Sequence, residues 1–111
     1  MNVLVTGSKG YIGTVLMNEL EKNNYKCKGL DLGYFCNCLI YPIKENYEYL
    51  NKDIRDVNLE DLKDIDAIIH LAALSNDPLG EFNPKLTEEI NYKATIKLAK
   101  LAKERGISRF I

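Results

Sequence analysis

The chain has 111 residues, and its 15 lysines and arginines nearly balance its 16 aspartates and glutamates, giving a net charge of −1. This length allows one domain at most, and the charge balance gives no reason to expect nucleic acid or an anionic membrane as a partner. No run of apolar residues approaches the roughly 18 that cross a membrane, so we expect no membrane partner either.

The chain opens with an apolar strand over residues 1–6, a glycine-rich turn, and an amphipathic helix expected from about residue 10 to residue 23. In the turn, Gly7 permits a tight bend, Gly10 lets a phosphate approach the backbone, and Gly13 lets the helix pack closely on the sheet. The amides of the first helical turn and the positive end of the helix dipole face the place where that phosphate would lie. The pattern predicts a dinucleotide pyrophosphate site, with a purely structural glycine turn as the alternative.

The rest of the chain alternates further strands with helices or crossovers. The elements expected are strands over 25–30, 47–50 and 67–71, a short helical segment over 59–63, a long helix over 84–105, and the start of a fifth strand over 108–111. This alternation predicts an α/β fold, a Rossmann-type parallel sheet with flanking helices and right-handed connections. The apolar side of the first helix is expected to comprise Ile12, Val15, Leu16 and Leu20.

Asp31 closes the second predicted strand, 18 residues after Gly13. A carboxylate at that point can accept hydrogen bonds from the 2′- and 3′-hydroxyls of a ribose and repels a 2′-phosphate. Residues 32–35 include no arginine that could hold such a phosphate. The sequence therefore favours NAD(H) over NADP(H), while an ordinary turn-forming aspartate is the alternative for Asp31.

Taken together, these motifs resemble the NAD-dependent epimerase/dehydratase family, the nucleotide-sugar branch of the extended short-chain dehydrogenase/reductases. Residues 6–13 fit the TGxxGxxG pattern of that family, residues 53–56 (Asp-Ile-Arg-Asp) fit its D-[LI]-R-D segment, and residues 70–73 (His-Leu-Ala-Ala) fit its H-L-A-A segment. The helix that carries Asn91 and the exit from it fit as well, so the resemblance spans essentially the whole chain. It implies a parent enzyme that uses NAD to move a hydride to or from a carbon of a nucleotide-sugar substrate.

The resemblance also implies roles for single residues. Asp31 would bind the adenosine ribose, and Asp53 and Ile54 would flank the adenine, with a turn or cap role as the alternative for Asp53. The residues implied along the nicotinamide side are Leu71, Ala72 and Ala73, for which tight strand-to-loop packing is the alternative. The residues implied along the pyrophosphate, largely through their backbone, are Gly7, Gly10, Tyr11, Ile12 and Gly13.

Asn91 falls on the edge of the apolar stripe of the long helix. A buried amide without partners costs about 1–3 kcal/mol, so we expect Asn91 to bond to backbone near the loop after the fourth strand. The alternative is an asparagine on the helix flank that contacts water. In that loop, Ser75 and Asp77 could face the sugar or phosphate of a substrate, although turn chemistry before Pro78 is the simpler interpretation.

The catalytic groups that the family would supply are not found in these 111 residues. They are a tyrosine in a YxxxK motif and a serine or threonine, and none of the seven tyrosines has a lysine four residues later. We therefore expect a partial NAD-binding domain over residues 1–111, without its catalytic and substrate portion and without turnover of its own. Two alternatives are a non-catalytic dinucleotide-binding module of the same fold and an NADP-linked reductase.

Two further expectations concern the surroundings of the chain. An uncovered edge of the parallel sheet favours association, so we expect a homodimer. The three cysteines are an odd number with poor zinc-ligand spacing, and no secretory signal is evident. We expect free thiols in a reducing cytoplasm and no metal site.

Overall fold

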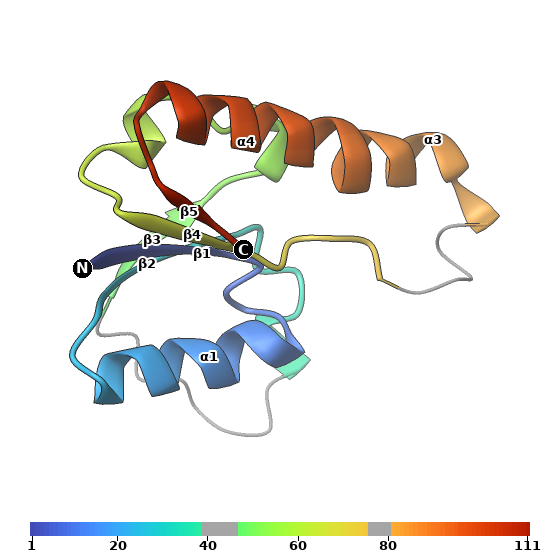
Figure 1. Cartoon of the computed structure of the whole chain (residues 1–111). Coiled ribbons are helices and arrows are strands. Elements are labelled where there is room, and N and C mark those ends of the chain that lie inside the picture. The colour runs from blue at the N-terminus through green and yellow to red at the C-terminus, as the bar shows by residue number, and fades with distance from the viewer. Residues whose placement is uncertain (39–46, 76–80) are drawn as a thin grey trace.

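The computed structural model describes residues 1–38, 47–75 and 81–111, in which a five-stranded sheet lies between two helical layers (Figure 1). The sheet has the order β3-β2-β1-β4-β5, and every neighbouring pair of strands is parallel. This confirms the predicted Rossmann-type sheet. The ends of the predicted strands shift by a residue or two, and the strands are β1 (Asn2–Thr6), β2 (Lys26–Asp31), β3 (Glu48–Asn51), β4 (Ala67–His70) and β5 (Arg109–Phe110).

Helices cover both faces of the sheet. One layer is α1 (Tyr11–Lys22), and the other is a continuous run of α3 (Pro84–Thr87), a π-helical segment (Glu88–Lys93) and α4 (Ala94–Glu104). The predicted helix over 84–105 is confirmed in extent, with wider π-helical turns inside it. No helix in the three described ranges is both long enough and apolar enough to cross a membrane. Short 3₁₀ turns cover Cys36–Cys38, Ile54–Asp56 and Glu60–Leu62.

Local chemistry sets the two ends of this helical run. The Asn83 side chain accepts a hydrogen bond from the Leu86 amide at 3.1 Å and so caps the first turn. Pro84 begins that turn, where an ordinary residue would have an unpaired N–H and proline has none. Gly106 follows the last turn with φ +74°, a left-handed conformation that ends a helix and favours glycine.

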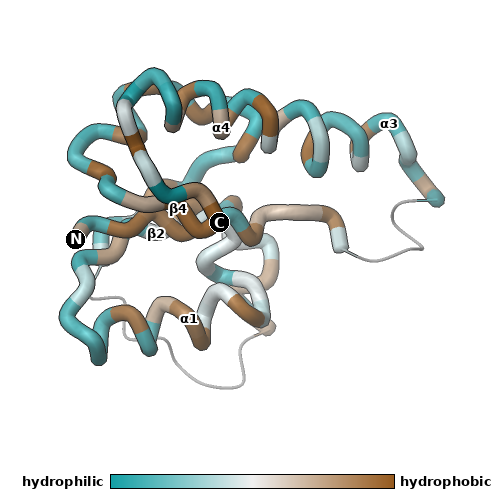
Figure 2. Tube along the Cα trace, viewed as in Figure 1, coloured by the Kyte–Doolittle hydropathy of each residue, from teal (hydrophilic) through white to brown (hydrophobic). Residues whose placement is uncertain are grey.

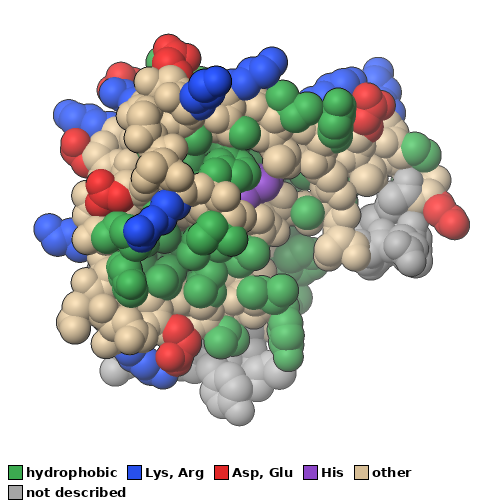
Figure 3. Space-filling view, in the orientation of Figure 1, with side chains coloured by type: hydrophobic (Ala, Val, Ile, Leu, Met, Phe, Trp, Pro, Cys, Tyr) green, Lys and Arg blue, Asp and Glu red, His purple; other side chains and the backbone are tan. Residues whose placement is uncertain are grey.

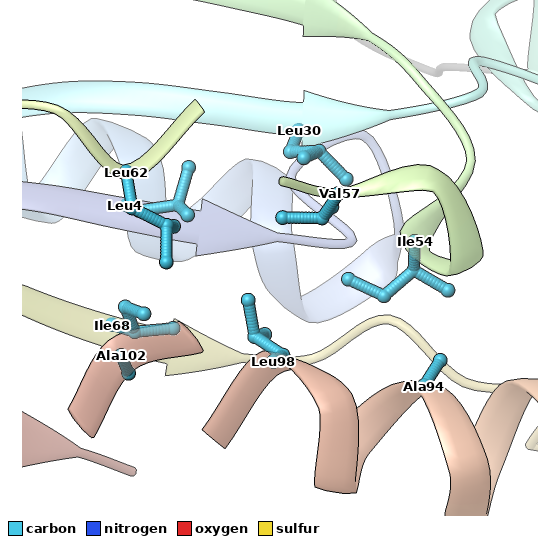
Figure 4. Close-up of a cluster of buried hydrophobic side chains, with 9 residues drawn as sticks. All are labelled: Leu4, Leu30, Ile54, Val57, Leu62, Ile68, Ala94, Leu98 and Ala102. Carbon is cyan, nitrogen blue, oxygen red and sulfur yellow. The ribbon is translucent and has the colours of Figure 1, made fainter. Parts of the chain in front are cut away.

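β1 lies at the centre of the sheet and separates two clusters of buried side chains, because alternate residues of a strand point to opposite faces. Val3 and Val5 pack with Met17 under α1, whereas Leu4 points to the face covered by α4. Figure 2 shows the hydrophobic strands between the two helical layers, with mostly hydrophilic residues along the outer side of α4. The cluster under α4, drawn in Figure 4, comprises Leu4, Leu30, Ile54, Val57, Leu62, Ile68, Ala94, Leu98 and Ala102.

The prediction for the apolar side of α1 is wrong in part. Ile12 and Val15 are 63% and 60% exposed, and the side that meets the sheet is instead formed by Gly13, Met17 and the partly buried Leu16 and Leu20. The reason lies in the glycine turn, since a Cβ placed on Gly13 would stand only 2.1 Å from the Gly7 carbonyl oxygen. That close approach turns Gly13 inward, and the residues one turn further along the helix follow it.

Candidate functional site

The glycine turn joins the end of β1 to the start of α1 with little room for side chains. Gly7 adopts φ +70°, and a Cβ there would lie 2.8 Å from both the Ala72 nitrogen and the Leu71 carbonyl carbon. The Gly7 amide donates to the Leu30 carbonyl at 2.8 Å, and the Gly10 amide donates to the Gly7 carbonyl at 3.0 Å. Gly7 and Gly13 are therefore required by the fold itself, as the sequence predicts.

Gly10 differs from the other two glycines of the turn. A Cβ on Gly10 would meet only the Gly7 carbonyl oxygen, at 3.2 Å, and its φ of −77° suits any residue. Gly10 is the N-cap of α1, where no side chain caps the helix and no acidic residue stands in the first turn. No carboxylate of the first turn therefore offsets the partial positive charge at this end of the helix, an arrangement that suits an anion.

Asp31 stands at the tip of β2 beside this turn. Its carboxylate accepts hydrogen bonds from the Lys9 amide at 3.1 Å and from the Gly33 amide at 2.7 Å, one on each oxygen. Each carboxylate oxygen has a second lone pair, so two further donors can be accepted by a side chain whose direction is already fixed. The half-buried position is consistent with the predicted ribose contact, which stays a prediction.

Tyr49 and Lys9 lie next to Asp31, and neither was predicted as a site residue from the sequence. The Tyr49 hydroxyl donates to the Asp31 carbonyl oxygen at 2.7 Å, and the Lys9 ammonium lies 3.7 Å from the centre of the Tyr49 ring. Burial, the largest cause, raises the pKa of the Tyr49 phenol. Residues 32–35 contain no cation, but the glycine turn itself contains one, Lys9.

The 53–56 segment forms a 3₁₀ turn with Asp53 as its N-cap. Asp53 caps the 3₁₀ turn by accepting from the Arg55 amide at 2.8 Å, and the Arg55 guanidinium holds both carboxylate oxygens at 3.0 and 2.7 Å. These bonds from Arg55 lower the pKa of Asp53. The Ile54 side chain is buried in the core, so a contact of this side chain with a ligand is not expected. The cap role is present, and the adenine contacts stay predictions.

The loop after β4 is fixed at both ends. The Thr6 hydroxyl oxygen accepts from the Leu71 and Ala72 amides, each at 3.2 Å. The Asn91 side chain donates to the Leu74 carbonyl at 2.9 Å and accepts from the Leu74 amide at 2.8 Å. The predicted backbone bond of Asn91 is confirmed, but Asn91 is exposed rather than buried. Its π-helical segment is a feature often found at functional positions.

The other predicted residues of this region lie on its surface or outside the described residues. Tyr11 is 94% exposed at the start of α1, and Ala73 and Ser75 are exposed in the loop. Asp77 lies outside the described residues. Within the ranges that the structure describes, no three side chains of His, Cys, Asp or Glu come together in a way that could hold a metal ion.

The glycine turn, Asp31 and the 71–74 loop lie at the carboxyl ends of β1, β2 and β4, where the chain changes faces of the sheet. After β1 the chain enters α1 on one face, and after β4 it enters the α3–α4 run on the other (Figure 1). In open α/β sheets, this switch point is where ligands bind. The sequence predicts the dinucleotide site at this same point.

Comparisons with known proteins agree with this arrangement. The family described as the NAD dependent epimerase/dehydratase family matches residues 3–111. The chain is 28% identical to a UDP-glucose 4-epimerase of Mycolicibacterium smegmatis, covering 100% of this chain and 37% of that protein. This protein therefore belongs to the NAD-dependent epimerase/dehydratase family.

Solved structures show the same fold. A UDP-N-acetylglucosamine 4-epimerase from Methanobrevibacter ruminantium, in complex with UDP-N-acetylmuramic acid, superposes with a TM-score of 0.83 at 34% identity, covering 98% of this chain and 36% of that one. A UDP-glucose-4-epimerase from Stenotrophomonas maltophila with bound NAD and formylated UDP-arabinopyranose gives 0.84 at 25% identity, covering 99% and 35%. The chain thus spans about a third of the length of the relatives it matches.

Proposed function

We propose that this chain is the NAD(H)-binding portion of a nucleotide-sugar epimerase or dehydratase. One observation carries the proposal: at the switch point of the sheet, the Asp31 carboxylate is held by the Lys9 amide of the glycine turn, 3.1 Å away. This bond ties the predicted ribose acceptor to the predicted pyrophosphate turn in one rigid unit. The bound NAD of a similar epimerase from Stenotrophomonas maltophila supports the same cofactor here.

In the proposed complex, the pyrophosphate lies on the glycine turn and the first turn of α1, and Asp31 accepts from the adenosine ribose. Asp53 and the backbone of Ile54 lie at the adenine end, as the family resemblance implies. The 71–74 loop lies under the nicotinamide side, and Asn91 acts by holding Leu74 rather than by touching the cofactor. The residues proposed along the pyrophosphate are Gly7, Gly10, Tyr11, Ile12 and Gly13.

NAD(H) is preferred over NADP(H) in this proposal because the Asp31 carboxylate would repel a 2′-phosphate. The NADP-linked alternative gains one observation, the Lys9 ammonium next to the Tyr49 ring beside Asp31. A cation there could pair with a 2′-phosphate if the carboxylate were absent. The preference therefore depends on the charge of Asp31.

Titration calorimetry with NAD⁺ and NADP⁺ tests the proposal on the folded chain. We expect NAD⁺ to bind, and Asp31→Ala to lower its affinity by about tenfold or more, the loss of charge-assisted bonds to a carboxylate. Asp31→Asn keeps the shape and one acceptor, so it separates charge from hydrogen bonding. Absence of NAD⁺ binding by a folded sample would reject the proposal, and unchanged selectivity in both variants would remove Asp31 from its role.

The chemistry proposed for the whole protein is hydride transfer at a carbon of a nucleotide sugar, in the cytoplasm. The UDP-sugars named with similar solved structures suggest a UDP-linked substrate, with Ser75 and Asp77 on its side. The 111 residues contain no YxxxK, so we propose that they bind the cofactor without turning over substrate. Reading the coding sequence that follows Ile111 for that motif separates an enzyme from a non-catalytic module of the same fold.

We also propose a homodimer in which a second copy covers exposed apolar side chains. Ile12 and Val15 of α1 are more than half exposed, and Phe110 and Ile111 at the edge of the sheet are 37% and 74% exposed. Figure 3 shows hydrophobic side chains gathered on the face of the molecule where α1 and β5 both lie. A single mass near 12.7 kDa by light scattering at tens of micromolar protein would reject the dimer.

A further inference from the structure

A hydrogen-bond network links the residues that hold the two ends of the 71–74 loop. Thr6 Oγ1 of β1 lies 2.7 Å from His70 Nδ1, and His70 Nε2 lies 2.8 Å from Thr95 Oγ1 of α4. The Thr95 hydroxyl in turn donates to the Asn91 carbonyl oxygen at 2.8 Å. Because Thr6 and Asn91 are also the residues that hold the two ends of the loop, the histidine connects both anchors.

The bonds of Thr95 determine whether His70 Nε2 carries a hydrogen. A threonine hydroxyl has one hydrogen to donate, and the Thr95 hydroxyl gives it to the Asn91 carbonyl, which can only accept. Thr95 Oγ1 must therefore accept from the histidine. His70 Nε2 carries the hydrogen.

The bonds of Thr6 lead to the same tautomer of His70. Thr6 Oγ1 accepts from the Ala72 amide at 3.2 Å and shares the Leu71 amide, which also donates to the Thr6 carbonyl oxygen at 3.1 Å. Both lone pairs of the hydroxyl oxygen therefore already face N–H donors. Its own hydrogen is then left for His70 Nδ1, which must be an acceptor and carry no proton. Both ends therefore require the neutral imidazole with its hydrogen on Nε2.

We propose that His70 is a positioning residue that holds the 71–74 loop in its binding geometry through this single tautomer. Among the described residues, the network holds the start of the loop through Thr6 and its end through Asn91, so the role requires no bond of His70 to the cofactor. The inference rests on the proposed NAD site for its effect on binding, but the tautomer and the order of the loop can be measured without a cofactor.

The surroundings of the imidazole support the neutral form. The ring is half-buried and lies 5.9 Å from the Phe110 ring, tilted by 47°. Burial lowers the pKa of His70. The hydrogen-bond partners of its ring nitrogens are the hydroxyls of Thr6 and Thr95, which do not titrate in the range of a histidine.

The direct test is the side-chain ¹⁵N spectrum of His70 in the full chain at neutral pH, without cofactor. His70 is the only histidine in the sequence, so its signals need no assignment. We expect a protonated Nε2 and an unprotonated Nδ1. A dominant Nδ1–H tautomer, a mixture of tautomers, or an imidazolium would overturn the proposal.

Matched variants on the same helical run test the role of the hydrogen-bond network. Thr95→Val removes the hydroxyl that accepts from His70, whereas Thr87→Val removes a hydroxyl that donates to the Asn83 carbonyl at 3.2 Å with no histidine attached. We expect Thr95→Val to raise amide exchange at Ala72 and Leu74 by about fivefold, the factor for one net hydrogen bond, and to weaken NAD⁺ by a similar factor. Thr95→Ser should restore both, and Thr87→Val should change neither.

The outcomes separate this inference from the proposed function. If the wild-type chain does not bind NAD⁺ but shows the Nε2–H tautomer and the exchange pattern above, the NAD site fails and the positioning of the loop stands. If NAD⁺ binds and Thr95→Val leaves tautomer, exchange and affinity unchanged, the positioning role fails and the NAD site stands. Equal effects of Thr95→Val and Thr87→Val would also overturn the role, because they would reflect general loss of helix stability.

Discussion

The two sides of the candidate site are built in opposite ways. On the side of the glycine turn, geometry is set by missing side chains, since Gly7 and Gly13 bring the backbone closer than any Cβ would allow. On the side of the 71–74 loop, geometry is set by polar side chains that hold backbone amides and carbonyls, above all Thr6 and Asn91. The first side fails by steric clash and the second by loss of hydrogen bonds, so the two should respond to mutation on different scales.

The largest effect is expected on the glycine side. Gly13→Ala places a Cβ 2.1 Å from the Gly7 carbonyl oxygen, so the helix must move away from the sheet. We expect a loss of about 3 kcal/mol or more in the free energy of unfolding, at the upper end for overpacking, measured by urea unfolding. Gly10→Ala is the matched control, since its Cβ would be 3.2 Å from the same oxygen. Equal losses in both variants would contradict the steric account.

A smaller effect is expected on the loop side. Thr6→Val keeps the shape of the buried side chain but leaves the Ala72 amide and His70 Nδ1 without the hydroxyl between them. We expect a loss of about 1–3 kcal/mol, the cost of buried groups left unpaired. Thr6→Ser, which keeps the hydroxyl, should lose less than half as much in the same urea experiment, and a larger loss for serine than for valine would contradict the prediction.

On the loop side, His70 should also make stability depend on pH. Burial holds the pKa of folded His70 below its ordinary value of 6.5. The neutral form is therefore favoured by the fold, and its stabilisation is present above pH 6.5 and lost as pH falls from there through the folded pKa. We expect the free energy of unfolding to fall over that range in the wild type. A His70→Gln variant should show a flatter profile, and parallel profiles would exclude His70 as the cause.

The smallest effect is expected at Asp53, which belongs to neither the glycine turn nor the 71–74 loop. Bonds from Arg55 hold the pKa of Asp53 below 3.8, so its stabilisation is present above that value and lost as pH falls through the folded pKa. Because the pair is close to solvent, Asp53→Asn should cost no more than about 0.5 kcal/mol at neutral pH. A loss above 1 kcal/mol in thermal or urea unfolding would show that Asp53 does more than cap its turn.

The same contrast explains what the sequence predicted. Strands, helices and the glycine turn leave local patterns, and three glycines within seven residues reveal a backbone requirement directly. The Thr6–His70–Thr95 link joins residues 64 and 25 positions apart, so no local pattern indicates it. Asn91 was found because its helical period placed it on an apolar edge. The outward face of Ile12 and Val15 was missed because period alone does not give the rotation of a helix against its sheet.

The central place of β1 has a consequence for how the chain folds. Its second neighbour in the sheet is β4, so Val3 pairs with Ala67 and Thr6 with His70, across more than half of the polypeptide. Such distant pairing makes folding slower than in a helical protein of equal size, because a long segment must be ordered before the contact forms. During synthesis on the ribosome, β1 emerges before β4, and its edge toward β4 stays unpaired until residue 70 has left the exit tunnel. That interval is when binding by a chaperone would matter most for this chain.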